Sequence, residues 1–169
     1  MSHPTVKLAL EAVRYFLNTG KPLPYPQNLS KEFHEGSAVF VSIKKDHKLR
    51  GCVGSITPQT KSLGSEIIRN AVSAATKDPR FPPISKLELA NLTFSVDVLT
   101  PLESVKEISE LDPKKYGLVI RQGSKSGLLL PDLDGVKTVE RQVEICKNKA
   151  GIAQSESVTM FRFQVNRHF

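Results

Sequence analysis

Two hairpin patterns constrain this chain more than any other feature of its sequence. Residues 38–44 and 48–56 are rich in β-branched and aromatic side chains and flank a polar turn at residues 46–47. Residues 116–121 and 127–130 repeat this arrangement across a turn that contains glycine and serine. Strands that are joined by short turns pair antiparallel. The two patterns therefore argue against a doubly wound parallel sheet, in which strands and helices alternate regularly.

Apolar residues at helical spacing predict three helices. The first follows a cap at Ser2 and ends at Gly20, the second runs from a cap at Ser62 to Thr76, and the third begins after Thr138. The remaining patterns are a helix end at Lys149, a short helix at residues 85–89, strands at residues 92–100 and 158–165, and an ambiguous stretch at residues 101–113. Helices and antiparallel strands in mixed order predict an α+β fold, with a mostly antiparallel sheet flanked by helices.

The length of 169 residues predicts a single domain, residues 1–169. No apolar run reaches membrane-spanning length, and the first residues lack the basic and apolar regions of a secretory signal. Two distant cysteines do not make a disulfide framework. These features predict a cytoplasmic protein that is not embedded in a membrane.

The net charge of +7 is compatible with acidic partners, including nucleic acid. The basic residues are scattered, however, and they lack the interleaved aromatic side chains of a nucleic-acid groove. Nucleic-acid binding therefore rests on charge alone, and the residue pattern argues against it.

The segment Leu49–Ser55 carries a cation, a thiol and two glycines in seven residues. If it is extended, Arg50, Cys52 and Gly54 share one face, and the guanidinium could lower the pKa of the thiol. Cys52 is then a candidate nucleophile, although a free cysteine is also a common small core residue. Gly51 and Gly54 contribute no packing, so they indicate that something approaches this backbone closely or that the strand bends.

The loop Asp78–Pro83 is stiffened by three prolines, which can hold side chains in place. Arg80 in such a loop could bind a carboxylate or a phosphate. Alternatively, Asp78 and Arg80 pair to staple the loop, with Phe81 in the core.

Three further motifs carry no chemistry. Cys146 lies on an apolar helical stripe, which indicates packing. Gly123–Gly127 lacks the spacing of a phosphate-binding loop and is typical of a hairpin turn. The four histidines are dispersed and no metal-ligand spacing occurs, so the sequence predicts no metal site.

Five elements of the chain, in order, resemble the signatures of the AMMECR domain family. They are Leu49–Ser55, Asp78–Pro83, Ser95–Pro101, Gly127–Pro131 and Cys146–Ile152. The resemblance covers essentially the whole chain. It implies an α+β fold with a larger and a smaller lobe, and places the Leu49–Ser55 signature near the cleft between the lobes.

The resemblance leaves the activity open, because no biochemical activity is established for the family. It implies Memo-like and radical SAM proteins as partners, and it names no cofactor. Asp132 stands where the family more often has glutamine, so no role of that glutamine can be transferred.

Two functional hypotheses follow for the signature segment. In the first, the chain is a ligand-binding or catalytic domain that takes an anionic small molecule. The binding residues would be Arg50, Gly51, Gly54, Asp78 and Arg80, with Cys52 as the catalytic candidate. In the second, the same segment is a docking surface of a non-catalytic protein-interaction module.

Overall fold

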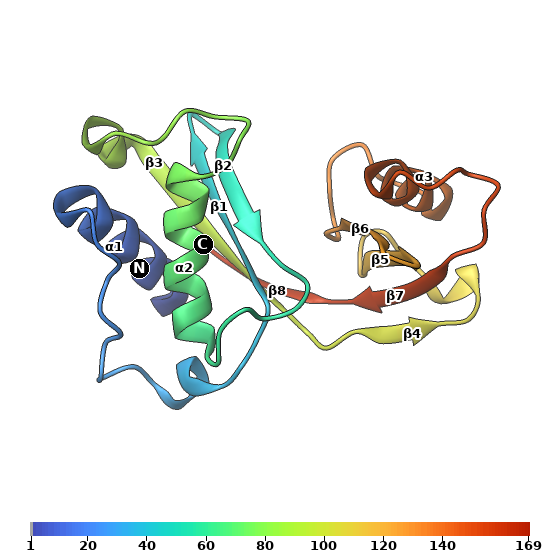
Figure 1. The fold of residues 1–169 in the computed structure, drawn as a ribbon, viewed down its shortest axis with the longest axis horizontal. Coiled ribbons are helices and arrows are strands. Elements are labelled where there is room, and N and C mark those ends of the chain that lie inside the picture. The colour runs from blue at the N-terminus through green and yellow to red at the C-terminus, as the bar shows by residue number, and fades with distance from the viewer. Residues whose placement is uncertain (1) are drawn as a thin grey trace. The chain divides into compact units, whose positions relative to one another are not determined.

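The computed structural model describes residues 2–169 and divides into two compact units. The first unit contains the described residues up to Val98 together with Asn166–Phe169, and the second contains Leu99–Val165. The second unit is therefore inserted into the chain of the first. Helices and two antiparallel sheets give the α+β fold that the hairpin patterns predict (Figure 1).

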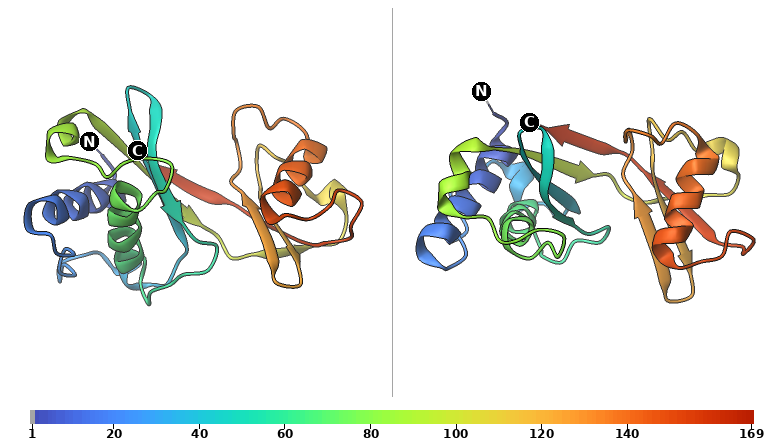
Figure 2. Two further views of the ribbon diagram at one scale, coloured as in Figure 1. Left: turned by 45° about the horizontal axis from the view of Figure 1, so that its top comes forward. Right: turned by 90° about the horizontal axis from the view of Figure 1, so that it is seen from above.

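The first unit is built on a four-stranded sheet with the order β2-β1-β3-β8. Its strands are β1 (Val39–Lys45), β2 (Lys48–Gly54), β3 (Leu92–Leu99) and β8 (Val165–His168). Its helices are α1 (Pro4–Thr19), η1 (Lys31–His34), α2 (Leu63–Thr76) and η2 (Lys86–Asn91). Both long helices lie over the same face of the sheet (Figures 1 and 2), where the core forms. The other face carries no helix of this unit.

Local sequence explains the ends of these elements. Asp46 and His47 have φ angles of 50° and 63°, which are the positive values that a two-residue hairpin turn requires, so the first predicted hairpin is confirmed. Ser62 caps α2 as predicted, because its hydroxyl accepts from the backbone amide of Ser65. The predicted cap of α1 at Ser2 is wrong: the cap is His3, whose ring accepts from the amide of Thr5.

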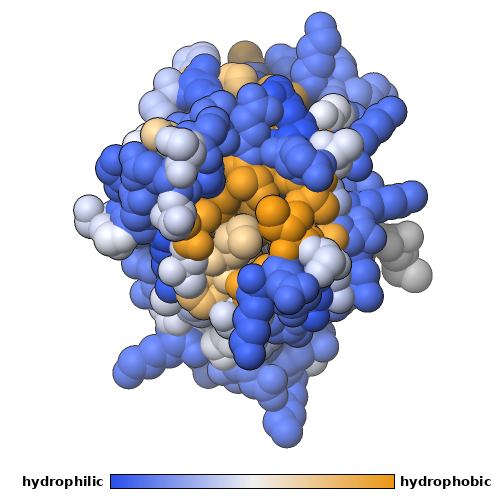
Figure 3. Space-filling model, turned by 90° about the vertical axis from the view of Figure 1, so that its right-hand side faces the viewer, coloured by the Kyte–Doolittle hydropathy of each residue, from blue (hydrophilic) through white to orange (hydrophobic). Residues whose placement is uncertain are grey.

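The second unit has a four-stranded sheet with the order β4-β7-β5-β6 and one long helix. The elements are β4 (Glu103–Val105), η3 (Ile108–Glu110), β5 (Gly117–Gln122), β6 (Lys125–Leu129), α3 (Val139–Ala150) and β7 (Thr159–Phe163). Helix α3 packs on β5 and β6, and Gly127 lies directly against the backbone of Cys146. In Figure 3, which faces this unit, a hydrophobic hollow is surrounded by hydrophilic residues.

The predicted strand at residues 158–165 is wrong as a single element. It is divided into β7, which ends at Phe163, and β8, which begins at Val165. Between them, Gln164 exchanges two hydrogen bonds with Thr100: its carbonyl accepts from the amide of Thr100, and its own amide donates to the Thr100 hydroxyl. The two strands belong to different sheets, so continuous alternation along the sequence hides the change of sheet.

Candidate functional site

The signature segment forms β2, at the edge of the first sheet. Cys52 lies opposite Ser42 of β1, and Ser42 lies opposite Ser95 of β3. The Ser42 hydroxyl donates to the Cys52 sulfur at 3.2 Å. These three small polar side chains form a row across the face of the sheet that is opposite to α1 and α2. We call them the Cys52 row.

The two glycines of β2 are explained by packing inside the protein. A Cβ atom on Gly51 would collide with the carbonyl oxygen of Ala74, since α2 lies directly on β2 at this position. A Cβ atom on Gly54 would collide with the ring of Phe40 and with the carbonyl oxygen of Val39. The close approach expected from the sequence therefore exists, and its source is the chain itself. Any role of these glycines in ligand binding stays a prediction.

The Asp78 carboxylate fastens the proline-rich loop to β2. It is 5% exposed and accepts the backbone amide of Cys52 at 2.9 Å. It also accepts the backbone amide of Arg80 at 3.1 Å and the Nε and Nη2 atoms of the same side chain at 3.0 Å and 2.7 Å. The Arg80 guanidinium, with the amides of Cys52 and Arg80, holds the pKa of the Asp78 carboxyl well below its usual range. The predicted Asp78–Arg80 pair is thus present.

Arg80 is both anchored and exposed. Its side chain is 56% exposed although two of its nitrogens bind Asp78, and its guanidinium lies 5.5 Å from the ring centroid of Phe81. Phe81 is only half-buried and packs under the arginine, so the alternative that placed it in the core is not what the structure has. Among the contacts of the described residues, the Nη1 atom of Arg80 makes no hydrogen bond.

Arg50 is placed differently. Its Nε and Nη2 atoms bind the two carboxylate oxygens of Glu88, each at 3.1 Å. Its Nη1 atom donates to the carbonyl of Pro82 at 2.8 Å, and the side chain is only 13% exposed. This ion pair lowers the pKa of Glu88 to about 2. Arg50 therefore ties β2 to the Pro82 loop and to η2, and it has little surface left for a ligand.

The environment of Cys52 keeps its thiol neutral. Burial raises the pKa of the Cys52 thiol, although the hydrogen bond from Ser42 and the charge of Arg80 act in the opposite direction. The arginine whose charge acts on the sulfur is thus Arg80, whereas sequence spacing indicated Arg50. A nucleophilic role for Cys52 stays a hypothesis, and this direction of the pKa argues against it.

Three acidic residues of the first unit were missed by sequence reasoning. Asp97 is 4% exposed, accepts two hydrogen bonds from Arg167 at 2.8 Å and 3.0 Å, and lies opposite Phe40 on the same face as the Cys52 row. Glu66 is fully buried and accepts from the amides of residues 59 and 60. The third is Glu88. An S-x-x-E capping box at Ser85 marks it in the sequence, and an acidic residue on an apolar helix stripe marks Glu66.

The described residues give no sign of a metal site or a membrane span. No three His, Cys, Asp or Glu side chains gather in residues 2–169 so that they could hold a metal ion. Within the same residues, no helix has the length and apolar character needed to cross a membrane. Cys146 is fully buried in the second core, where burial raises the pKa of its thiol to about 12.

The fold and the site define an α+β protein with two four-stranded antiparallel sheets and a thiol beside an anchored arginine. The AMMECR1 family model matches residues 6–168, so the chain belongs to that family. It is 45% identical over 169 residues to a protein of Thermotoga maritima, and the match covers 98% of this chain and 97% of that protein.

Other relatives extend the comparison. A protein of Clostridium acetobutylicum is 48% identical over 167 residues, and the chain spans only 36% of that longer relative. The crystal structure of the uncharacterized protein PH0010 from Pyrococcus horikoshii superposes with a TM-score of 0.90 at 31% identity. That superposition covers 96% of this chain and 88% of the Pyrococcus chain, so it includes both units.

Proposed function

We propose that the chain binds a small anionic molecule at the Cys52 row, with Arg80 as the anion-binding side chain. One observation carries the proposal: a single carboxylate, Asp78, binds the backbone of Cys52 and the guanidinium of Arg80 together. An exposed cation is thereby held at a fixed place beside a half-buried thiol. Such preorganised charge is typical of sites that recognise carboxylates or phosphates.

Arg80 is favoured over Arg50 for this role because of what each guanidinium already binds. Arg50 is nearly enclosed by Glu88 and backbone carbonyls. Arg80 has one carboxylate partner and leaves more than half of its side chain in solvent. A carboxylate or phosphate ligand can reach Arg80 without breaking an internal contact, whereas at Arg50 it would have to displace Glu88.

Binding is favoured over nucleophilic catalysis because the Cys52 thiol has a raised pKa. A neutral thiol is a poor nucleophile but a suitable lining group for a ligand. The alternative of a protein-interaction module remains, and the family resemblance supports Memo-like and radical SAM proteins as partners. We also propose a cytoplasmic location, since both cysteines are free thiols.

The test compares two alkylating reagents at Cys52, one anionic and one neutral. Iodoacetate is attracted to a neighbouring guanidinium, whereas iodoacetamide is not. In Arg80→Gln, we expect the ratio of the iodoacetate rate to the iodoacetamide rate at Cys52 to fall about threefold. This is the effect expected for the loss of one charge a few ångströms away in a medium of high dielectric constant. Mass spectrometry of the Cys52 peptide measures both rates, and inorganic phosphate should slow the iodoacetate reaction in the wild type.

Two variants make the test specific. Arg141→Gln is the matched control, because Arg141 is 52% exposed and pairs with Glu144 on its own helix, α3, in the second unit. Arg80→Lys keeps the charge and should retain most of the wild-type ratio. The proposal is wrong if Arg80→Gln leaves the rate ratio unchanged in a protein that melts like the wild type, or if phosphate slows both reagents equally.

A further inference from the structure

A second candidate site lies on the opposite side of the first unit, away from the Cys52 row. Between the end of α1, the following connector and the outer side of α2 there is an open groove of about 500 Å³, which we call the α1–α2 groove. Its lining residues are Phe16, Pro22, Leu23, Tyr25, Ser65, Ile68, Arg69, Val72, Ser73 and Lys77. No helix or strand of the described residues fills it.

The floor of the groove is apolar and its outer wall is stiff. Phe16, Leu23 and Val72 are half-buried apolar side chains, and Leu23 and Val72 pack against the core of the unit. The wall is a connector with prolines at positions 22, 24 and 26. Tyr25 holds this wall in place, because its hydroxyl donates to the carbonyl of Phe33 at 3.1 Å and lies 3.0 Å from the ring of His34. The groove is therefore formed before any partner binds.

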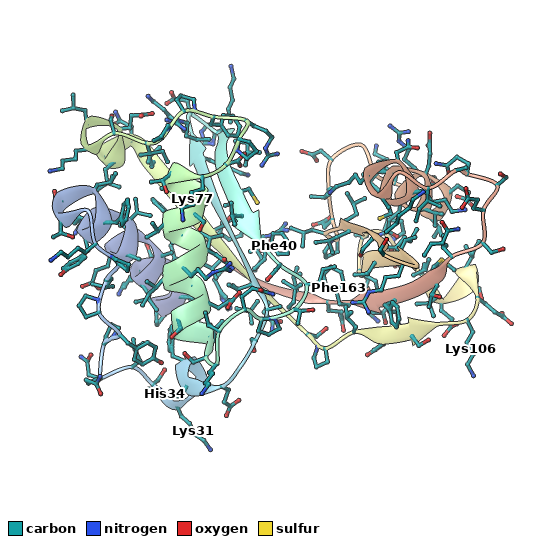
Figure 4. The ribbon with its side chains drawn as sticks, viewed as in Figure 1. Lys31, His34, Phe40, Lys77, Lys106 and Phe163 are labelled. Atoms are coloured by element: carbon teal, nitrogen blue, oxygen red, sulfur yellow. The ribbon has the colours of Figure 1, made fainter. Side chains whose placement is uncertain are left out.

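The charged residues that line the groove are both cationic, Arg69 and Lys77. Arg69 is 51% exposed and has the buried Glu66 at 3.8 Å as its nearest carboxylate. Lys77, labelled in Figure 4 at the end of α2, is exposed. They lie eight residues apart, Arg69 on α2 and Lys77 at the cap position directly after it, which corresponds to about 12 Å along the helix axis. The two cations thus lie on the α2 side of the groove, with Val72 and Ser73 between them in the sequence.

We propose that the α1–α2 groove binds an amphipathic helix of a partner protein that carries acidic residues on the edge of its apolar face. A hydrophobic groove can bind the apolar face of an amphipathic helix, which is one of the recurring modes of peptide recognition. A helix that lies along α2 places residues seven apart at about the spacing of the two cations, on one face. The partner therefore needs apolar residues at helical spacing and two acidic residues about seven positions apart.

The charges also distinguish this partner from a second copy of the chain. In a two-fold dimer built on the groove, the same patch faces itself, so Arg69 and Lys77 of one copy approach those of the other. Such a contact sets cation against cation. A partner with acidic residues removes this repulsion and gains two ion pairs at the edge of an apolar contact.

The experiment uses the full chain and a synthetic fluorescein-labelled peptide. The peptide is an amphipathic helix with a leucine face and two glutamates seven residues apart, and the control peptide carries lysines at those two positions. We expect the acidic peptide to bind with at least about tenfold higher affinity than the basic one, from two charge pairs at the rim. Fluorescence anisotropy measures both affinities.

The second part of the experiment reverses charge in the protein instead of in the peptide. Lys77→Glu, alone or combined with Arg69→Gln, should weaken the acidic peptide about tenfold and improve binding of the basic one. Arg141→Glu, on α3 of the second unit, is the control and should change neither affinity. Lys77 is exposed, so the single variant tests the groove even if changing Arg69 disturbs Glu66.

Two results would overturn the proposal. One is equal affinity of the wild type for both peptides, or acidic-peptide binding that Lys77→Glu leaves intact. The other is a dimer in sedimentation equilibrium that Lys77→Glu strengthens, because relief of the repulsion between facing cations assigns the groove to a second copy of the chain. Neither result bears on the Cys52 row, which lies on the other face of the sheet.

Discussion

At the scale of single residues, the signature segment combines two roles that the sequence cannot separate. Gly51 and Arg50 hold the first unit together, one by allowing α2 to lie on β2 and the other by binding Glu88. Cys52 is half-buried and Arg80 is 56% exposed, and these are the residues of the proposed anion site. Regular alternation would place Arg50 and Cys52 on one face, but the register of β1 and β2 shifts between Ile43↔Gly51 and Lys44↔Leu49, so Arg50 lies at an irregularity of the strand and serves a different purpose from Cys52.

The packing role of Gly51 gives a prediction for stability. Gly51→Ala places a methyl group against the carbonyl of Ala74, which is backbone and cannot move aside as a side chain can. We expect the free energy of unfolding to fall by about 1–3 kcal/mol, the usual cost of overpacking. Gly36→Ala is the control, because a Cβ atom there meets only a carbonyl oxygen at 3.4 Å. Urea denaturation measures both, and equal losses in the two variants would contradict the explanation.

At the scale of elements, the loop Asp78–Pro83 is held near both of its own ends by the signature strand. Asp78 binds the amide of Cys52, and Arg50 binds the carbonyl of Pro82. Glu88 completes the arrangement, since it accepts both Arg50 and the amide of Ser85 at the start of η2. The loop thereby covers the edge strand β2. The amide of Cys52, which has no neighbouring strand to bind, donates to Asp78 and is not available to a strand of another molecule.

The Arg50–Glu88 pair predicts how this region responds to acid. Glu88→Gln should lower the free energy of unfolding at neutral pH by about 1–2 kcal/mol, since the pair is largely but not fully buried. Because the folded pKa of Glu88 is depressed to about 2, its contribution is complete above the ordinary value of 4.5 and is lost as the pH falls toward 2. Denaturation at several pH values between 4.5 and about 2 should show that Glu88→Gln loses less unfolding free energy than the wild type does.

An exposed pair serves as the comparison for that prediction. Glu144 binds Arg141 at 2.7 Å, but both side chains are about half exposed, at 45% and 52%. Glu144→Gln should therefore change the free energy of unfolding by less than about 0.5 kcal/mol. If Glu144→Gln costs as much as Glu88→Gln, burial is not what makes the Arg50 pair important.

Much of this element structure could be predicted from the sequence, and the site could be predicted only in part. Apolar residues recur at helical spacing in the three long helices and at every second position in the hairpin strands. These spacings could be recognised in the sequence because each element buries one face. The partner of Arg50 could not be predicted, since Glu88 is 38 residues away in the chain and only the fold brings it near. The split at Gln164 was hidden for a similar reason: two strands of the same period follow each other in different sheets.

At the scale of the whole molecule, the first unit is completed only after the chain has passed through the second. The chain leaves the first sheet after β3 and returns as β8, which neighbours β3. Two contacts join the returning strand to α1. The amide of His3 donates to the carbonyl of Phe169 at 3.2 Å, and the rings of His3 and His168 stack with centroids 3.7 Å apart. We call these contacts the closure of the first unit, and a stack of two histidine rings is one of them.

This closure should weaken in mild acid. Burial and the neighbouring His3 lower the pKa of His168 in the folded protein, while the charges of Asp97 and Glu32 act in the opposite direction. The unfolded chain therefore binds a proton at His168 at a higher pH than the folded protein does. Its contribution to stability is complete above the ordinary pKa of 6.5 and is lost as the pH falls below that value.

Replacing one ring tests this closure, since His168→Phe keeps an aromatic ring for stacking and removes the titrating group. Between about pH 8 and about pH 5.5, we expect the wild type to lose more unfolding free energy than the variant, because the folded protein binds a proton at His168 less readily than the unfolded chain does. Thermal or urea denaturation at both pH values measures the difference, and His34→Phe, which changes a histidine outside the stacked pair, is the control. If His168→Phe and the wild type lose the same stability, the stacked pair does not make the closure of the first unit sensitive to pH.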